Sequence, residues 1–169
     1  MHAFEAALKA GKTSTAEATA IFDSLEPVPV EFMFGLWEGG EFPTDHPMDG
    51  MLTATGWYGK RFGDAEAGDP LLFRTTDDKG FFVANAREVM SRVDQRVRMC
   101  QYREEVETDQ PQSRLRMLEF RGKSSATMIY DELPILDHFR KVDNDRVLGA
   151  MDLRGVAQTY FFILSRVRA

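Results

Sequence analysis

The sequence has almost no cysteine, no long apolar run and no excess of basic residues. Cys100 is the only cysteine among 169 residues, so no internal disulfide can form and a reducing compartment is expected. No apolar stretch approaches the roughly 18 to 20 residues needed to span a bilayer. The first residues, Met1 to Glu5, also lack the charged and apolar regions of a signal peptide. We therefore expect a cytoplasmic protein without an integral membrane segment.

The formal net charge of -6 argues against a nucleic-acid partner, because phosphates are neutralised by clustered Lys and Arg. The familiar motifs of several enzyme classes are also absent: a Gly-rich phosphate loop, a GxSxG elbow, HExxH and paired CxxC. Nucleotide hydrolysis, acyl transfer by a serine triad and zinc-finger behaviour thus lose their usual support. The cluster Asp45 to Asp49 contains a histidine but is interpreted as a turn, so no metal site is predicted.

Length favours a single domain over residues 1–169, and its helical start covers residues 1–26. The apolar spacing of Phe4, Ala7 and Leu8 predicts a short helix that stops at Gly11. Ser14 and Glu17 have the spacing of a capping box, which predicts a second helix that ends before Pro27. Both helices are expected to pack on a sheet as a cap.

The central region, residues 27–84, contains the stretch Gly35-Leu36-Trp37-Glu38-Gly39. Apolar residues alternate along Val28 to Phe34, which predicts a half-buried strand leading into it. Glycines within a strand allow a bend or a close backbone approach. Downstream, Trp57 to Phe62 combines aromatic rings with two cations, which could line or cover the mouth of a pocket and hold an anionic or planar ligand. The alternative is a surface turn with snorkelling cations.

Short strands are predicted at Pro70 to Arg74 and Phe81 to Ala84, joined by a turn that ends at Gly80. Residues 86–101 fit either a helix or a strand, and residues 104–112 form a polar, exposed connection. The C-terminal region, residues 112–169, contains five β-favouring runs separated by short turns, which indicates an antiparallel meander. Closure of these strands into a barrel would remove exposed edges. The expected fold is mainly β, an antiparallel barrel with a helical cap.

Within the meander, Asp137 and His138 are adjacent, so a regular strand directs one of them into the barrel. An inward Asp137 among apolar neighbours would be suited to acid–base chemistry. An inward His138 could be a base, an anchor or a metal or haem-iron ligand. Tyr130 could reach the same cavity. The alternative reading is that each polar group is satisfied by a neighbouring strand.

The residues GLWEG match a G-x-W-x-G motif, and Pro27 to Phe73, including GWYGKRF, resembles the bacterial GXWXG protein family. The tail from LEFRGK to GAMD resembles the domain of unknown function that commonly follows this motif. The family has no agreed activity. The G-x-W start is also similar to that of lipocalins and fatty-acid-binding proteins, in which the Trp closes one barrel end beneath an Arg of the last strand. That resemblance implies a calycin-like barrel and places Arg166 over Trp37.

The leading functional hypothesis is a binding protein for a small apolar or lipid-like ligand, such as a fatty acid, held in the barrel cavity. One alternative is a small-molecule enzyme that uses Asp137 or His138 as acid or base, and another is haem binding through His138. The sequence assigns neither a cofactor nor an oligomeric state. The predicted ligand contacts are Trp57, Tyr58, Lys60, Met128, Tyr130 and Phe139.

Overall fold

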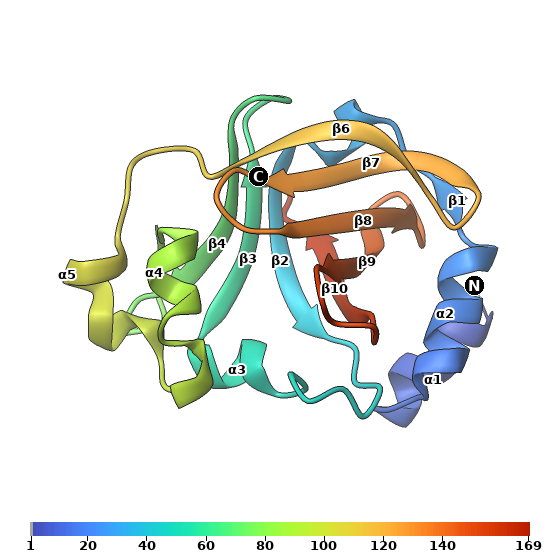
Figure 1. Cartoon of the computed structure of the whole chain (residues 1–169), viewed down its shortest axis with the longest axis horizontal. Helices are drawn as coiled ribbons and strands as arrows, with labels where there is room; N and C mark the ends of the chain where they lie inside the picture. Colours follow the sequence, from blue (N-terminus) through green and yellow to red (C-terminus); the bar gives the residue numbers. More distant parts are fainter. Residues whose placement is uncertain (1) are drawn as a thin grey trace.

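A computed structural model describes residues 2–169 as a β-barrel with helices on two sides (Figure 1). The helices, including single 3-10 turns marked η, are α1 (His2–Ala10), α2 (Thr15–Ser24), η1 (Val30–Met33), α3 (Met51–Thr55), α4 (Ala86–Met90), η2 (Val93–Gln95), η3 (Met99–Tyr102) and α5 (Arg103–Val106). The strands are β1 (Glu26–Pro27), β2 (Gly35–Glu41), β3 (Trp57–Phe62), β4 (Gly68–Arg74), β5 (Phe81–Val83), β6 (Ser113–Phe120), β7 (Lys123–Tyr130), β8 (Ile135–Lys141), β9 (Arg146–Leu153) and β10 (Tyr160–Arg166).

Eight antiparallel strands close the barrel in the order β8-β7-β6-β4-β3-β2-β10-β9, and β9 pairs back onto β8. The five C-terminal runs predicted from the sequence correspond to β6 through β10. The expected barrel, mainly β with N-terminal helices, is confirmed and is consistent with a calycin-like architecture. The weakest seam joins β4 to β6, where the single paired position is Gly68 with Ser113. The chain between β5 and β6 packs beside this seam, with α4 and α5 next to β4 (Figure 1).

The two predicted N-terminal helices are confirmed. Ser14 is the N-cap of α2, and the reciprocal bonds between Ser14 and Glu17 form the predicted capping box. Phe4 of α1 and Phe22 of α2 are buried in a second apolar cluster together with Phe161 from the outer face of β10. The helices therefore cover the outside of the barrel, on the side opposite α4 and α5 (Figure 1).

Two strand-level predictions for the central region were wrong. The alternating residues Val28 to Phe34 do not form a strand, because Val30–Met33 make a 3-10 turn and β2 begins only at Gly35. The apolar residues here are still buried, but by folding over the barrel end rather than by pairing. The segment Trp57 to Phe62 is neither a turn nor a mouth cover; it is strand β3, paired with β2 and β4.

The segment that the sequence left open, residues 86–101, forms the short helix α4 followed by two 3-10 turns. Asn85 caps α4 by accepting a hydrogen bond from the backbone of Glu88. The connection beyond it, residues 104–112, is mostly exposed, as predicted. Within it, Val106 of α5 is fully buried and joins the barrel's core cluster.

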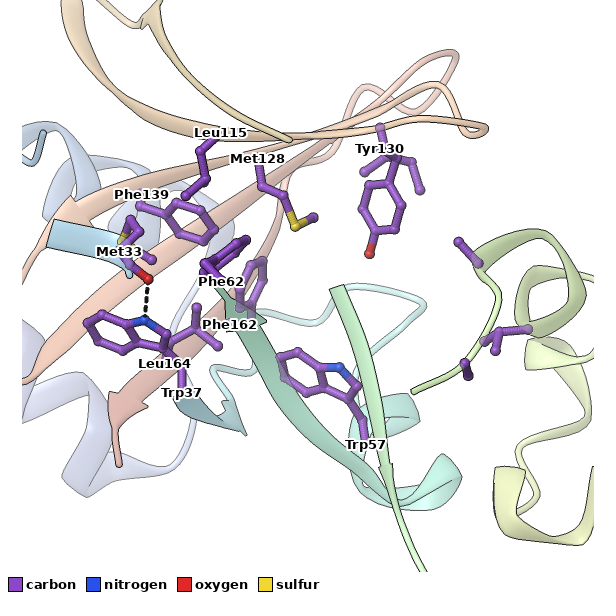
Figure 2. Close-up of a cluster of buried hydrophobic side chains, with 14 of the residues drawn as sticks. Met33, Trp37, Trp57, Phe62, Leu115, Met128, Tyr130, Phe139, Phe162 and Leu164 are labelled. Carbon is purple, nitrogen blue, oxygen red and sulfur yellow. Dashed lines mark hydrogen bonds between the residues drawn. The ribbon is translucent and has the colours of Figure 1, made fainter. Parts of the chain in front are cut away.

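Trp37 closes one end of the barrel. Its side chain is fully buried, and its Nε1 donates a hydrogen bond to the carbonyl oxygen of Met33 at 2.8 Å (Figure 2). The guanidinium of Arg166 lies 4.2 Å from the centre of its ring. Arg166 in turn donates to the carbonyl oxygens of Phe34 and Phe32. The expected Arg over the Trp is thus present. Arg166 also connects β10, the last strand, to the segment that leads into β2.

Two positions, Gly39 of the motif and Gly59 of β3, have no room for a side chain, and a different neighbour blocks each of them. A Cβ on Gly39 would lie 2.0 Å from the Trp57 ring, so the missing side chain makes room for that ring inside the barrel. A Cβ on Gly59 would lie 1.9 Å from the backbone oxygen of Trp37, and Gly59 has φ +152°. Here the backbone of β2 itself occupies the space.

Among the residues that the structure describes, no helix is long and apolar enough to cross a membrane.

Candidate functional site

The barrel end opposite Trp37 contains a small, mostly apolar cavity of about 80 Å³. At about 30 Å³ per water molecule in the liquid, this volume corresponds to roughly two to three waters. Figure 2 shows the two regions side by side: Trp37, Phe62, Leu115 and Phe139 pack together, while the Tyr130 hydroxyl points toward Trp57 at the far side. The cavity wall includes Trp57, Lys60, Tyr130, Asp137, Met151 and Phe162.

A buried ion pair spans this wall. Lys60 Nζ of β3 lies 2.9 Å from Asp137 Oδ2 of β8, and both side chains are 3% exposed. Lys60 Nζ also donates to the carbonyl oxygen of Pro70 at 3.3 Å. The second carboxylate oxygen, Asp137 Oδ1, is buried and has no hydrogen-bond partner among residues 2–169. An unpaired buried acceptor is costly, so this oxygen requires a donor from outside the described side chains, such as a water or a ligand group.

Three aromatic rings surround the Lys60 ammonium. Its Nζ lies 5.4 Å from the centre of the Trp57 ring, 5.6 Å from that of Tyr130 and 5.3 Å from that of Phe162. Each ring is within cation–π range, which helps to hold a cation away from water. The rings also leave the rest of the cavity apolar. The site therefore combines one neutral ion pair with an aromatic wall.

Burial raises the pKa of the Tyr130 phenol well above its usual range, and the Asp137 carboxylate adds to this effect. The hydroxyl is therefore protonated at neutral pH. It is involved in none of the hydrogen bonds found in the described part of the chain, and it points into the cavity (Figure 2). Tyr130 thus presents an unused donor beside the unused Asp137 oxygen.

The local structure of β3 explains how Trp57 and Lys60 reach the same cavity. Residues three apart on a regular strand face opposite sides. The pairing of β3 with β4 shifts register on both sides of Gly59, so the alternation changes phase between Trp57 and Lys60. Gly59 is the residue that permits this irregularity, because β2 passes too close for a Cβ.

The alternation of β8 separates Asp137 from His138. Asp137 faces the cavity, whereas His138 faces the outside of the barrel, where it is buried against the Phe120 ring at a centroid distance of 3.9 Å. Its Nδ1 lies 2.9 Å from the Thr127 hydroxyl, and its Nε2 lies 3.7 Å from Asp152 Oδ2. Burial lowers the pKa of His138, partly opposed by Asp152 and Asp137.

The structure brings together four of the predicted site residues: Trp57, Lys60, Tyr130 and Asp137 line the cavity. Tyr58 lies on the opposite face of β3, where its ring contacts Phe81 at 4.7 Å. Met128 and Phe139 point inward but are fully buried in the packed part of the interior. They support the cavity floor without lining the cavity.

Sequence reasoning missed the cavity residues of the last two strands and of the covering segments. Met151 is the cross-strand partner of Asp137, so the β8–β9 register could have found it. Phe162 has the same inward alternation in β10. Leu52, Met90 and Val93 close the outer side of the cavity from α3, α4 and η2. No sequence pattern marks these three residues, because they reach the cavity only through the tertiary packing of short helical segments against the barrel.

Within residues 2–169 no group of three or more His, Cys, Asp or Glu side chains could hold a metal ion. His46, the histidine of the Asp45 to Asp49 turn, has both ring nitrogens engaged: Nδ1 accepts from the backbone of Met48, and Nε2 contacts the carbonyl oxygen of Gln158. Asp49 accepts from the backbone of Thr44 and His46. These bonds make the segment a turn.

Comparisons with known proteins place this geometry in a family. The model described as GXWXG protein matches residues 20–78, and the domain of unknown function DUF4334 matches residues 111–166. A crystal structure of a protein from Thermomonospora curvata is 36% identical with a TM-score of 0.76, over 99% of this chain and 100% of that one. No curated protein matches the sequence. The chain therefore belongs to the GXWXG protein family, with the DUF4334 domain as its C-terminal part.

Proposed function

We propose that this protein binds a small, mostly apolar molecule in the barrel cavity. The observation that carries the proposal is the unpaired Asp137 Oδ1 in the wall of an otherwise apolar space. Ligand sites in proteins are typically apolar pockets with a few placed polar groups. A buried ion pair contributes little net stability compared with apolar residues of similar size. Stability of the barrel alone therefore does not explain Lys60 and Asp137 at this position.

The size of the cavity restricts the ligand. Room for roughly two to three water molecules excludes a long-chain fatty acid in the described conformation. A longer ligand would have to displace Leu52, Met90 or Val93 on the outer side. The two covering segments are joined by Arg96, which donates to the carbonyl oxygens of Asp49 and Pro47. The proposal is therefore a short ligand rather than an extended lipid.

The two tryptophans provide a built-in test. Trp57 lines the cavity, whereas Trp37 is fully buried at the closed end. In Trp37→Phe the only tryptophan emission comes from Trp57, and it should shift saturably when short alcohols, alkanes or alkylbenzenes are titrated. In the matched control Trp57→Phe the emission of Trp37 should stay nearly constant.

Native mass spectrometry of the purified protein gives an independent measurement, because a bound small molecule adds a discrete mass. Failure of every compound to give a saturable Trp57 response, with no added mass, would overturn the proposal. An equal response from both single-tryptophan variants would also count against it, since it would indicate a global change rather than cavity binding.

A small-molecule enzyme is a second candidate, supported by the same carboxylate. Asp137 Oδ1 is free to accept a proton from a bound molecule, and Lys60 Nζ is 2.9 Å from the other oxygen. An acid–base residue must lie within hydrogen-bond reach of its substrate, and Asp137 is the group that faces the cavity. His138 faces away from it and is not a candidate base for a ligand in this cavity.

Proton abstraction can be tested with cyclohexanone in D₂O. Asp137 would take a proton from the carbon next to the carbonyl, Lys60 would hold the enolate oxygen, and a solvent deuteron would return to carbon. NMR should show deuterium incorporation that Asp137→Asn abolishes and His138→Asn leaves unchanged. Incorporation at the uncatalysed rate with wild-type protein would count against this second candidate for such ketones.

The geometry gives no support to haem binding in the barrel through His138. The ring lies on the outer face of β8, stacked on Phe120 with an interplanar angle of 2°, and Nδ1 is engaged by Thr127. An iron at Nε2 would compete with Asp152 for the same position, outside the barrel. We therefore propose no role for haem.

A further inference from the structure

We infer that the polar end of the cavity recognises a hydroxyl group, so that the ligand is a small alcohol or phenol. This inference rests on the proposed binding function and names the ligand class. It starts from Asp137, whose Oδ2 is held by Lys60 at 2.9 Å while Oδ1 is buried without a partner in the described chain. The ligand must therefore donate a hydrogen bond at this position.

Donors from the protein lie on the same side of the cavity. Lys60 has three N–H groups, of which one serves Asp137 and one the carbonyl oxygen of Pro70, so one is left over. The protonated Tyr130 hydroxyl is also unused and points into the cavity (Figure 2). A bound group is thus offered one acceptor and two donors.

A hydroxyl group uses both kinds of partner, because it donates one hydrogen bond and accepts others. A ligand carboxylate would instead add a second negative charge beside Asp137, with a single Lys60 to neutralise both. A ligand ammonium would add a second cation beside Lys60. An ether or ketone accepts only and would leave Asp137 Oδ1 unpaired, as would a hydrocarbon.

The apolar part of the ligand contacts aromatic side chains. Trp57, Tyr130 and Phe162 surround Lys60 at 5.3 to 5.6 Å and form much of the remaining wall. Aromatic pairs prefer offset or edge-to-face contacts, which a single flat ring can make with this wall. The cavity volume of about 80 Å³ is smaller than the roughly 150 Å³ that holds benzene in a dry protein cavity. One six-membered ring with a hydroxyl or hydroxymethyl group is therefore the upper limit of ligand size, and it requires a shift of the covering residues Leu52, Met90 or Val93.

A matched series on one ring tests the inference: benzyl alcohol, toluene, benzoate and benzylamine, with dissociation constants measured by calorimetry. Hydrogen bonds to charged groups are strong when water is excluded, so benzyl alcohol should bind about tenfold or more tightly than toluene. Benzoate and benzylamine should bind more weakly than the alcohol. Tyr130→Phe should reduce the alcohol preference without abolishing it, because Asp137 remains.

The double variant Lys60→Met/Asp137→Leu is the decisive control, because it removes both charges together and keeps an apolar interior. Its preference should invert, with toluene binding at least as tightly as benzyl alcohol. Equal binding of toluene and benzyl alcohol to wild type, or tighter binding of benzoate, would overturn the hydroxyl inference while leaving the binding function intact. Binding of none of the four, with an unresponsive Trp57, would remove both.

Discussion

The two ends of the barrel interior each hold one tryptophan, and their surroundings differ. Trp37 packs against Met33, Arg166 and neighbouring aromatic rings, and every polar atom of its side chain is satisfied. Trp57 lines the cavity, 5.4 Å from a buried ammonium whose partner has an oxygen without a hydrogen bond to the described residues. The first end is built as a plug, and the second keeps both volume and hydrogen-bonding capacity unused.

The motif that names the family contributes to both ends. Its tryptophan, Trp37, fills the closed end, and its second glycine, Gly39, leaves room for the Trp57 ring at the other. A single strand of seven residues thereby fixes where the interior is filled and where it stays open. Packing is a sufficient explanation for Trp37 and Gly39, so these two residues of the motif do not point to a particular chemistry.

Replacement of each tryptophan should give the largest difference in stability between the two ends of the barrel. Trp37→Ala should lower the free energy of unfolding by about 4 to 5 kcal/mol, because it removes a fully packed ring and leaves the Met33 carbonyl without its donor. Trp57→Ala should cost less, since part of its ring already faces empty space. Urea unfolding of both variants measures the difference, and equal losses would show that the two ends are packed alike.

Removal of one member of the ion pair is expected to have the next largest effect. Asp137→Leu leaves the Lys60 ammonium buried without a counter-ion and should cost about 3 kcal/mol. The double variant Lys60→Met/Asp137→Leu should unfold within about 1 kcal/mol of wild type, because neither charge remains. Chemical denaturation of both proteins checks this. A double variant as unstable as the single one would mean that the pair itself stabilises the barrel.

The sequence predicted the barrel because its strands carry local signals. β6 through β10 are β-favouring runs separated by short turns, and α2 carries its own capping box. The prediction failed for Val28 to Phe34, where alternation arose from packing over the barrel end and not from pairing. Period alone cannot separate these cases when a segment is only a few residues long.

The candidate site could be predicted only in part. Alternation required either Asp137 or His138 to face the barrel interior. Which of the two does so depends on the register of β8, and this register is set by contacts with β7 and β9. Trp57 and Lys60 share a face only because of the register shift at Gly59, and Tyr58 is directed outward for the same reason. Such a shift depends on the close approach of β2, a long-range contact.

Gly39→Ala should have a smaller effect on stability, and it tests whether the Trp57 ring borders the ligand. Its Cβ would lie 2.0 Å from the Trp57 ring, which must move, and the cavity is the space available to it. We expect a loss of about 1 to 2 kcal/mol in unfolding free energy together with weakened ligand binding. Gly40→Ala is the matched control, because its Cβ would meet nothing within 4 Å. Unchanged binding in Gly39→Ala would show that the Trp57 ring does not border the ligand.

The smallest effect concerns the outer face of β8, where His138 is buried away from the cavity. Desolvation lowers its pKa in the folded state, opposed by Asp152 and Asp137 and reinforced by Arg140. The unfolded chain, with an ordinary pKa of about 6.5, then binds this proton more readily than the folded protein. Stability contributed by neutral His138 is therefore present above about pH 6.5 and is lost as the pH falls through the folded pKa. His138→Gln should flatten this decline in unfolding free energy between pH 7 and 5, whereas parallel curves for variant and wild type would assign the slope to other groups.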